Sequence, residues 1–284
     1  MDLDAGRGRS WSSLFAAVIA ALFVGIAAVL VVSAQISGQE RPLEDRVSAY
    51  APAAAADPVA AAIPATVTPD TTAVTGTEST DTPVADPAPA DVPSTVQLVT
   101  ADATWSARTA AVTGIPERAL RAYASAALTV KAEQPSCGLG WNTLAGIGAI
   151  ESAHGTHSGG HLDDAGYPQP AIRGIPLDGT ASAAIADSDG GKWDGDATWD
   201  RAVGPLQFIP ATWQRWGADG NGDGVADPNQ IDDAALAAGR YLCAAGEMTS
   251  ASGWRRAIFS YNHLDSYVDD VAAMANTYAA RAAG

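Results

Sequence analysis

The chain has 284 residues, of which 47% are hydrophobic and 17% charged, and its formal net charge is −16. This charge argues against a nucleic-acid partner, because a phosphate binder needs a basic patch. The tryptophans, glycines and both cysteines concentrate after Trp105, where about 180 residues remain, enough for one domain with a hydrophobic core.

An uncharged apolar segment lies near the N-terminus. Residues Leu14–Val32 carry no charge and are long enough to cross a bilayer as a helix. Arg7 and Arg9 precede the segment, which favours a cytoplasmic N-terminus. We expect residues 1–13 in the cytoplasm, a single-pass transmembrane signal-anchor at 14–34, and the rest of the chain outside the cell membrane. A cleaved signal peptide is the alternative, since small residues end the segment.

The following stretch has the composition of a tether. It is rich in Ala, Pro, Thr, Val and Asp, and residues 51–96 contain no aromatic side chain. Such a segment cannot bury enough apolar surface to offset its ordering entropy. We expect a disordered linker at 35–104 and a catalytic domain at 105–284.

Helical periodicity dominates the domain, and no run of alternating β-branched residues predicts a strand ladder. The fold class is therefore mainly α. Helices are expected over residues 115–133, 141–153, 210–216, 232–245, 252–261 and 265–283. Between them, residues 154–200 form a long Gly- and Asp-rich loop, and loops of that length usually have a function.

The two cysteines, Cys137 and Cys243, suggest a disulfide if the domain lies outside the membrane. The closed loop would stabilise the fold by about 4–5 kcal/mol in the chain-entropy model. A catalytic thiol at Cys137 is the alternative, although no histidine lies near it in sequence.

Glu151 stands alone in the apolar stretch GIGAIESAHG, at the end of the helix expected over 141–153. Apolar neighbours and the helix C-terminus both favour the protonated carboxyl. A carboxylic acid that is protonated near neutral pH can act as the general acid in glycoside cleavage. A solvent-exposed carboxylate at a helix end is the alternative.

Ordinary glycosidases need a second carboxylate. The loop after Glu151 offers several, and spacing does not choose among them. The candidates are Asp163, Asp164, Asp194, Asp196 and Asp200.

Two further segments combine aromatic and amide side chains: AVGPLQFIPATW and FSYNHLDSY. Most of their aromatics, among them Tyr267, fit a hydrophobic core. Gln207, Tyr261 and Asn262 are harder to explain there, because buried polar groups need partners. Amides and aromatics around one acid suit a carbohydrate groove.

The motifs AIESAHG, GPLQFIPATW and SYNHLDSY, in this order, resemble the lytic transglycosylases of the cell wall. Over roughly Ile115 to Tyr278 the chain is similar to the membrane-bound B-type family, in its actinobacterial form. The resemblance implies a goose-type lysozyme-like domain that faces the cell wall and binds peptidoglycan glycan strands.

The resemblance also implies a mechanism with one catalytic glutamate, matched by Glu151, and no cofactor in catalysis. The glutamate protonates the glycosidic oxygen between N-acetylmuramic acid and N-acetylglucosamine. It then removes the proton of the sugar's own 6-hydroxyl, which closes a 1,6-anhydro ring without water. By the same resemblance, the substrate-binding residues would be Ser152, Gln207, Tyr261 and Asn262, with Tyr261 orienting Glu151 or shaping its pocket.

One position departs from the family, whose members often carry a serine shortly before the G-x-x-Q segment. In this chain the segment DATWDRAVGPLQ has no serine, and only Thr198 or Asp200 could take its place. An inward-pointing Asp200 would favour a muramidase-type hydrolase that uses water. A non-catalytic cell-wall-binding module is a further alternative.

The segment ADGNGDGVADPNQIDD begins like an EF-hand loop, so a structural Ca²⁺ is expected here. Short oxygen side chains and one carbonyl follow the EF-hand spacing. The resemblance implies that a late carboxylate, Asp233, closes an elongated loop. The expected ligands are Asp219, Asn221, Asp223, Val225 and Asp233, with Asp227 as a further contributor.

His154, His157 and His161 have a spacing that could bind zinc, as in a zinc amidase or peptidase. No HExxH pattern accompanies them, and solvated loop histidines are the simpler interpretation.

Overall fold

The computed structural model describes residues 97–180 and 182–284. The expected signal-anchor at 14–34 and most of the expected linker lie outside these residues. Within the described part of the chain, no helix combines the length and the apolar character that crossing a membrane requires.

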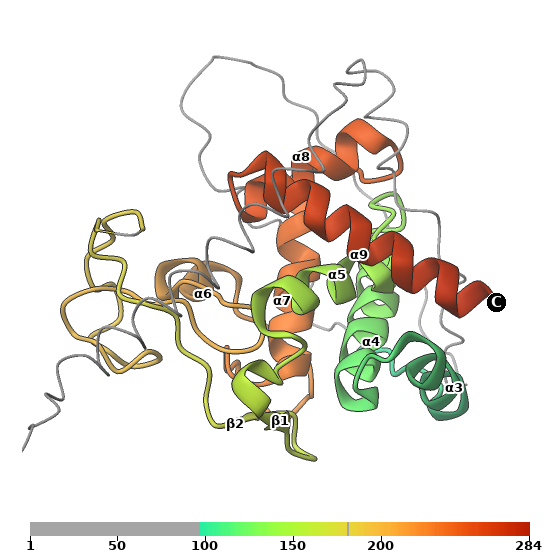
Figure 1. Cartoon of the computed structure of the whole chain (residues 1–284), viewed down its shortest axis with the longest axis horizontal. Coiled ribbons are helices and arrows are strands. Elements are labelled where there is room, and N and C mark those ends of the chain that lie inside the picture. The colour runs from blue at the N-terminus through green and yellow to red at the C-terminus, as the bar shows by residue number, and fades with distance from the viewer. Residues whose placement is uncertain (1–96, 181) are drawn as a thin grey trace, which may run out of the picture. The chain divides into compact units, whose positions relative to one another are not determined.

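The described residues form a mainly helical domain (Figure 1). Each expected helix is present within two residues of its expected ends, and one further helix, Ala103–Thr113 (α3), was not expected. Two short strands of two residues each, His161–Leu162 (β1) and Pro168–Gln169 (β2), pair antiparallel, and the sequence did not predict them. The elements are α3 Ala103–Thr113, α4 Glu117–Glu133, α5 Trp141–Ser152, η1 His157–Gly159, β1 His161–Leu162, β2 Pro168–Gln169, α6 Pro210–Trp216, α7 Ile231–Ala244, α8 Ala251–Tyr261 and α9 Asp265–Ala283.

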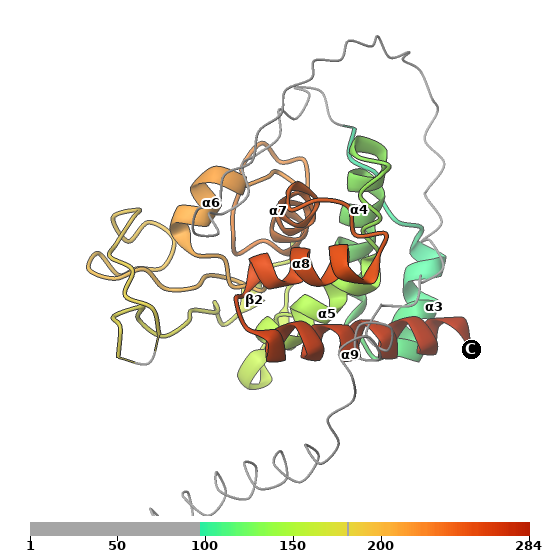
Figure 2. The same cartoon turned by 90° about the horizontal axis from the view of Figure 1, so that it is seen from above.

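Helix α5 lies at the centre of the packing, against both α4 and α9 (Figure 2). Residues 141–148 are all buried, so this helix has no solvent-facing stripe over its first two turns. Gly146 allows α9 to approach, since a Cβ there would lie 2.9 Å from the carbonyl oxygen of Val271. Gly148 leaves room for the hydroxyl of Tyr123 from α4. Small residues therefore let neighbouring helices hold α5 in place.

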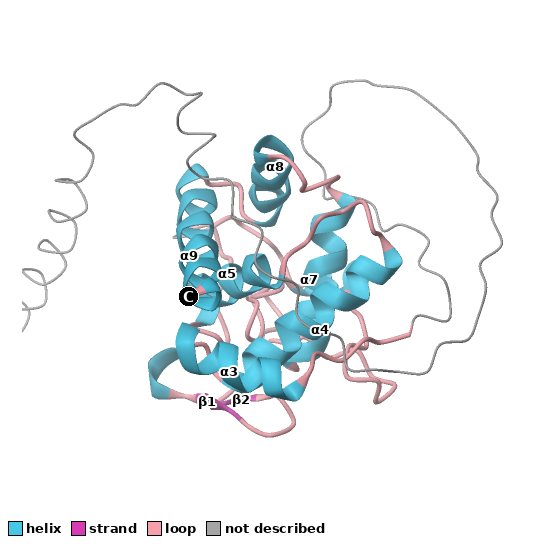
Figure 3. Cartoon of the chain, turned by 90° about the vertical axis from the view of Figure 1, so that its right-hand side faces the viewer, coloured by secondary structure: helices cyan, strands magenta, loops and turns pink. Residues whose placement is uncertain are grey.

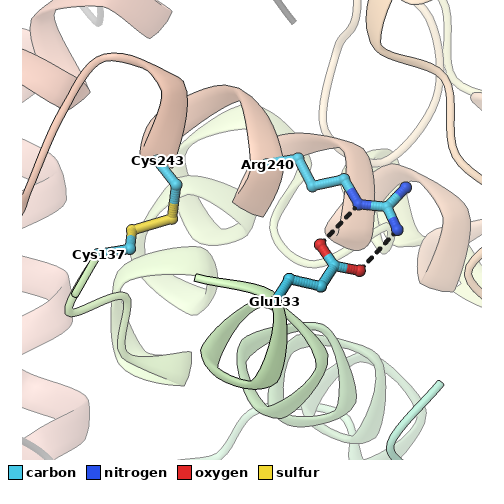
Figure 4. Close-up of a disulfide and its surroundings, with 4 residues drawn as sticks. All are labelled: Glu133, Cys137, Arg240 and Cys243. Atoms are coloured by element: carbon cyan, nitrogen blue, oxygen red, sulfur yellow. Dashed lines mark hydrogen bonds and ion pairs between the residues drawn. A yellow bond between two sulfur atoms is a disulfide. The ribbon is translucent and has the colours of Figure 1, made fainter. Parts of the chain in front are cut away.

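The end of α4 is joined to α7 twice (Figure 4). Cys137 and Cys243 form the expected disulfide, with their Cα atoms 5.4 Å apart. Arg240 donates two hydrogen bonds to the carboxylate of Glu133, at 3.0 and 2.7 Å. The disulfide excludes a free catalytic thiol at Cys137.

The packed domain begins before the expected boundary at Trp105. The backbone N–H of Val99 donates to Thr129 Oγ1 at 2.9 Å, and that of Ala101 donates to Ser125 Oγ at 3.0 Å. Both acceptors lie on α4, and Ala101 is buried. Residues 97–104, assigned above to the linker, thus pack against the domain.

A long irregular segment connects β2 to α6 and forms a lobe beside the helices, yellow in Figure 1. Isolated bridges replace regular strands here, including Ala186 with Trp199 and Val203 with Phe208. Figure 3 shows the opposite side of the domain, where the helices α4 and α7 lie next to each other. This segment and α6 supply one wall of the candidate site.

Candidate active site

Glu151 lies in the last turn of α5, where the chain leaves the helix through a left-handed turn. Ala153, His154 and Gly155 have φ angles of 50°, 63° and 81°. Glu151 is half-buried, and its Oε1 accepts a 2.6 Å hydrogen bond from the hydroxyl of Tyr267. Tyr267 is buried in the first turn of α9. The contact between α5 and α9 thus fixes the carboxyl group.

Burial raises the pKa of Glu151 to about 7, and the hydrogen bond from Tyr267 limits that rise. Burial, with the nearby Glu151 charge, raises the pKa of Tyr267 far above its usual range, so its hydroxyl is protonated and donates. The expectation of a carboxyl protonated near neutral pH therefore agrees with the local geometry.

A groove of about 810 Å³ opens beside Glu151. The lobe, the GPLQF segment and α6 line one side of the groove, and the end of α8 with its connection to α9 lines the other. Among the described lining residues, Glu151 is the only carboxylate and His263 the only basic side chain. The lining residues are Glu151, Leu177, Ala183, Ile185, Ala202, Gln207, Phe208, Ile209, Ala211, Thr212, Tyr241, Ser260, Tyr261, Asn262, His263 and Leu264.

Gln207 and Asn262 line the groove, as the sequence led us to expect. Gln207 adopts a left-handed backbone conformation with φ 49°, and its Nε2 donates to the carbonyl of Gly204 at 2.8 Å. Val203 and Phe208 exchange backbone hydrogen bonds around this tight turn, at 2.8 and 3.0 Å. Asn262 directly follows the last residue of α8.

Tyr261 shapes the groove and does not hydrogen-bond to Glu151. Its hydroxyl donates to the carbonyl of Leu206 at 2.8 Å, and its ring packs edge-on against Phe208 and Tyr241. Of the two roles considered, the structure supports the shaping of the pocket. Tyr267 lies in the hydrophobic core, as expected, and its hydroxyl is the group that hydrogen-bonds to Glu151.

Ser152 does not reach the groove, which corrects its assignment to substrate binding. The side chain is 1% exposed. Its hydroxyl donates to the carbonyl of Pro205 at 2.6 Å and accepts from the N–H of Gly155 at 2.7 Å. Ser152 therefore ties the end of α5 to the GPLQF segment.

The loop aspartates do not line the groove. Asp200 is fully buried and accepts hydrogen bonds from the backbone N–H and the hydroxyl of Ser188, at 2.8 and 2.7 Å. Asp194 accepts the backbone N–H of Arg201 at 2.7 Å, and Asp196 forms an ion pair with that arginine. These carboxylates stabilise the lobe and offer no second group at Glu151.

The expected calcium loop folds around its own carboxylates. Asp233 is fully buried and accepts the backbone N–H groups of Gly220, Asn221 and Asp227, at 2.7, 3.2 and 2.9 Å. Asp219 accepts from Gly222, Asp223 and Gly224, while Val225 donates its N–H to Asp223. Burial raises the pKa of Asp233 to about 6, against the lowering effect of its N–H donors.

The carboxylates that lie close enough together to share a metal ion belong to the lobe and not to the calcium loop. In the described part of the chain, carboxylate oxygens of Asp187, Asp189 and Asp200 lie within 4.8 Å of one another, and the calcium-loop carboxylates form no such group. Calcium binding by the loop stays a prediction.

The structure does not bring the three histidines together as a metal site. His154 is buried, with Nε2 2.8 Å from the Tyr278 hydroxyl and Nδ1 3.3 Å from that of Tyr123. Burial lowers its pKa to about 4, so the ring is neutral at pH 7. His157 and His161 are exposed. Zinc chemistry therefore has no site among these residues.

A single acid in a groove between helices is an arrangement suited to glycan cleavage. Residues 184–258 match the family model described as a transglycosylase SLT domain. The match confirms the resemblance to lytic transglycosylases and supports a glycan-cleaving domain that acts on peptidoglycan. It includes Gln207 and Asp200, and Glu151, Tyr261 and Asn262 lie outside it. No curated protein and no solved structure matches the chain.

Proposed function

We propose that this protein is a lytic transglycosylase that cleaves the bond between N-acetylmuramic acid and N-acetylglucosamine and leaves a 1,6-anhydro end. The observation that carries the proposal is the set of charges in the groove. Glu151 is the only carboxylate among its described lining residues, and burial raises the pKa of this group to about 7. In the proposed reaction this one carboxyl group serves as both acid and base.

The proton balance needs no second carboxylate. Protonated Glu151 donates its proton to the glycosidic oxygen as the C1–O bond breaks, and the leaving sugar departs with a 4-hydroxyl. The carboxylate that remains takes the proton of the 6-hydroxyl on the muramic acid. That oxygen forms the new bond to C1, and Glu151 is protonated again.

The hydrogen bond from Tyr267 supports this double role. It holds one oxygen of Glu151 and leaves the other free to face the substrate. It also stabilises the carboxylate formed after the first proton transfer. Asn262 and Gln207 supply amide groups for the N-acetyl substituents, and the aromatic rings of the groove supply surfaces for sugar faces.

Product analysis tests the proposal. Peptidoglycan incubated with the full chain should release fragments with anhydro ends, detected by mass spectrometry. The Glu151→Gln variant should release none, and Glu247→Gln, an exposed substitution of the same kind, should behave as the parent. Ordinary reducing ends would favour the muramidase alternative, and binding without cleavage would favour a wall-binding module.

We also propose that the N-terminal apolar segment anchors the protein in the cell membrane, with the domain outside. The uncharged run at Leu14–Val32 and the preceding Arg7 and Arg9 support this. Membrane fractionation tests it: the full chain should sediment with membranes, and a chain that lacks residues 1–34 should not.

A further inference from the structure

The groove contains a basic side chain that the proposed reaction does not use. His263 lies in the connection between α8 and α9, two residues after Tyr261. It is exposed, and its ring packs edge-on against Phe259 at 5.4 Å between centroids. In the described structure no hydrogen bond engages either ring nitrogen. The ring is thus held at the groove wall with both nitrogens available.

Among the described residues that line the groove, no side chain other than His263 is basic, and none is a lysine or an arginine. Arg255, on α8, donates to Asp269 at 2.7 Å and lies 3.8 Å from Asp265. Arg201, in the lobe, is paired with Asp196. Among the described lining residues, a negative group on the substrate would therefore meet His263 as the only basic partner and Glu151 as the only acidic group.

The proposed substrate carries such a negative group on only one of its two sugars. N-acetylmuramic acid bears a lactyl carboxyl, which is either free or joined by an amide to a peptide with carboxylates of its own. N-acetylglucosamine bears none. A carboxylate in a groove needs a hydrogen-bonding partner, and an imidazole can donate an N–H and, when protonated, supplies a positive charge.

We propose that His263 is a specificity-determining residue that binds a substrate carboxylate, from the lactyl group or from the attached peptide, and so favours peptidoglycan over chitin. This inference rests on the proposed function, because it takes peptidoglycan as the substrate. The side chain contacts a substituent remote from the broken bond. It therefore acts on substrate binding and leaves the proton transfers of Glu151 unchanged.

The test compares three substrates at one pH and low salt, with the full chain in detergent. They are intact glycan strands with peptides, strands freed of peptides by an amidase, and neutral chitin oligomers. His263→Ala should raise KM about five- to tenfold for at least one carboxylate-bearing substrate, with kcat unchanged. The same variant should leave the kinetics on chitin oligomers unaltered.

Two variants control the result. His263→Lys should restore the KM, because lysine supplies an N–H donor and a positive charge at the groove wall. His161→Ala, which removes an exposed histidine that does not line the groove, should match the parent on all substrates. A KM effect confined to peptide-free strands identifies the lactyl carboxylate as the ligand, and one confined to intact strands identifies a peptide carboxylate.

An equal KM effect on chitin oligomers, or none on either carboxylate-bearing substrate, would overturn the proposal. Failure of the proposed function is a separate outcome, since it shows as ordinary reducing ends or as an active Glu151→Gln variant. Binding of the three substrates to the Glu151→Gln chain, with and without His263→Ala, decides the role of His263 even where cleavage is absent. Weaker binding of carboxylate-bearing strands alone supports the proposal, and any other pattern contradicts it.

Discussion

The hydroxyl of Tyr267 donates a 2.6 Å hydrogen bond to Oε1 of Glu151, and this contact joins the end of α5 to the start of α9. The tyrosine lies 116 residues after the glutamate, so packing between the two helices creates the pair. The pair places the proposed acid at the groove and stabilises the carboxylate that it becomes.

Tyr267→Phe should shift the pH dependence of cleavage. The hydrogen bond lowers the pKa of Glu151, so its loss should raise that pKa above about 7. The reactive form of the enzyme carries the protonated acid, and the alkaline limb should move to higher pH. We expect kcat to fall about tenfold at the optimum, because the carboxylate loses a donor. A pH–rate profile of both proteins checks this, and an unmoved limb would contradict it.

Glu151→Gln should stabilise the fold above pH 7. The pKa of Glu151 rises from 4.5 to about 7 on folding, so the folded protein holds this proton more tightly than the unfolded chain does. The contribution to stability is full below pH 4.5 and is lost as the pH rises through about 7. At about 1.4 kcal/mol per pKa unit, the ionised carboxylate costs roughly 3 kcal/mol at high pH.

Urea unfolding of parent and variant from mildly acidic to alkaline pH measures this difference. The gain in the free energy of unfolding should shrink toward zero as the pH falls below 4.5. Glu247→Gln, the same substitution at an exposed position, is the matched control. A Glu151→Gln variant that is equally stable at every pH would show that the carboxyl is not desolvated.

Removal of the disulfide should destabilise the domain without a change in its groove. Cys137 and Cys243 close a loop across 106 positions, for which the chain-entropy model gives about 4–5 kcal/mol. The Cys137→Ser/Cys243→Ser protein retains the Glu133–Arg240 ion pair, which continues to hold α4 to α7. Denaturant unfolding should show the loss, while cleavage at low temperature should be close to that of the parent. A loss below 1 kcal/mol would contradict the expectation.

Calcium should stabilise the domain if the loop at 219–233 binds it. Free Ca²⁺ at a hundredfold excess over its dissociation constant would add about 2.7 kcal/mol to the free energy of unfolding. Removal with a chelator should reverse the gain, and Asp219→Asn should weaken it. Identical melting curves with calcium and with chelator would show that the hydrogen bonds to Asp219 and Asp233 suffice to hold the loop.

Most helices of the domain follow from the spacing of their apolar residues, because each presents one stripe to the core. Helix α3 escaped prediction because Trp105 is its only large buried apolar side chain, while Ser106, Thr109 and Thr113 fill the remaining buried positions. The hydroxyls of Ser106 and Thr113 donate to the backbone carbonyls of Asp102 and Thr109, one turn earlier, at 2.8 and 2.6 Å. Hydrophobic periodicity does not detect such a helix.

Glu151 could be singled out because a lone carboxylate among apolar residues is costly unless it has a role. The hydrogen-bond partner of Glu151 could not be predicted from the sequence, since Tyr261 and Tyr267 occur in one motif and both are aromatic residues with hydroxyls. The tertiary structure decides between them: the hydroxyl of Tyr261 is engaged by Leu206, and Tyr267 faces α5. The place of Ser152 likewise depends on the Pro205 carbonyl, which its own sequence neighbourhood does not contain.

Digestion of peptidoglycan in ¹⁸O-labelled water tests the central claim most directly, because only a hydrolase adds a solvent oxygen to the product. We predict anhydro-muramic ends without ¹⁸O, since the 6-hydroxyl of the sugar supplies the new bond to C1. Reducing ends that carry one ¹⁸O atom per cleavage would contradict the account, and would require a base that activates water, a role for which the described lining of the groove contains no second carboxylate.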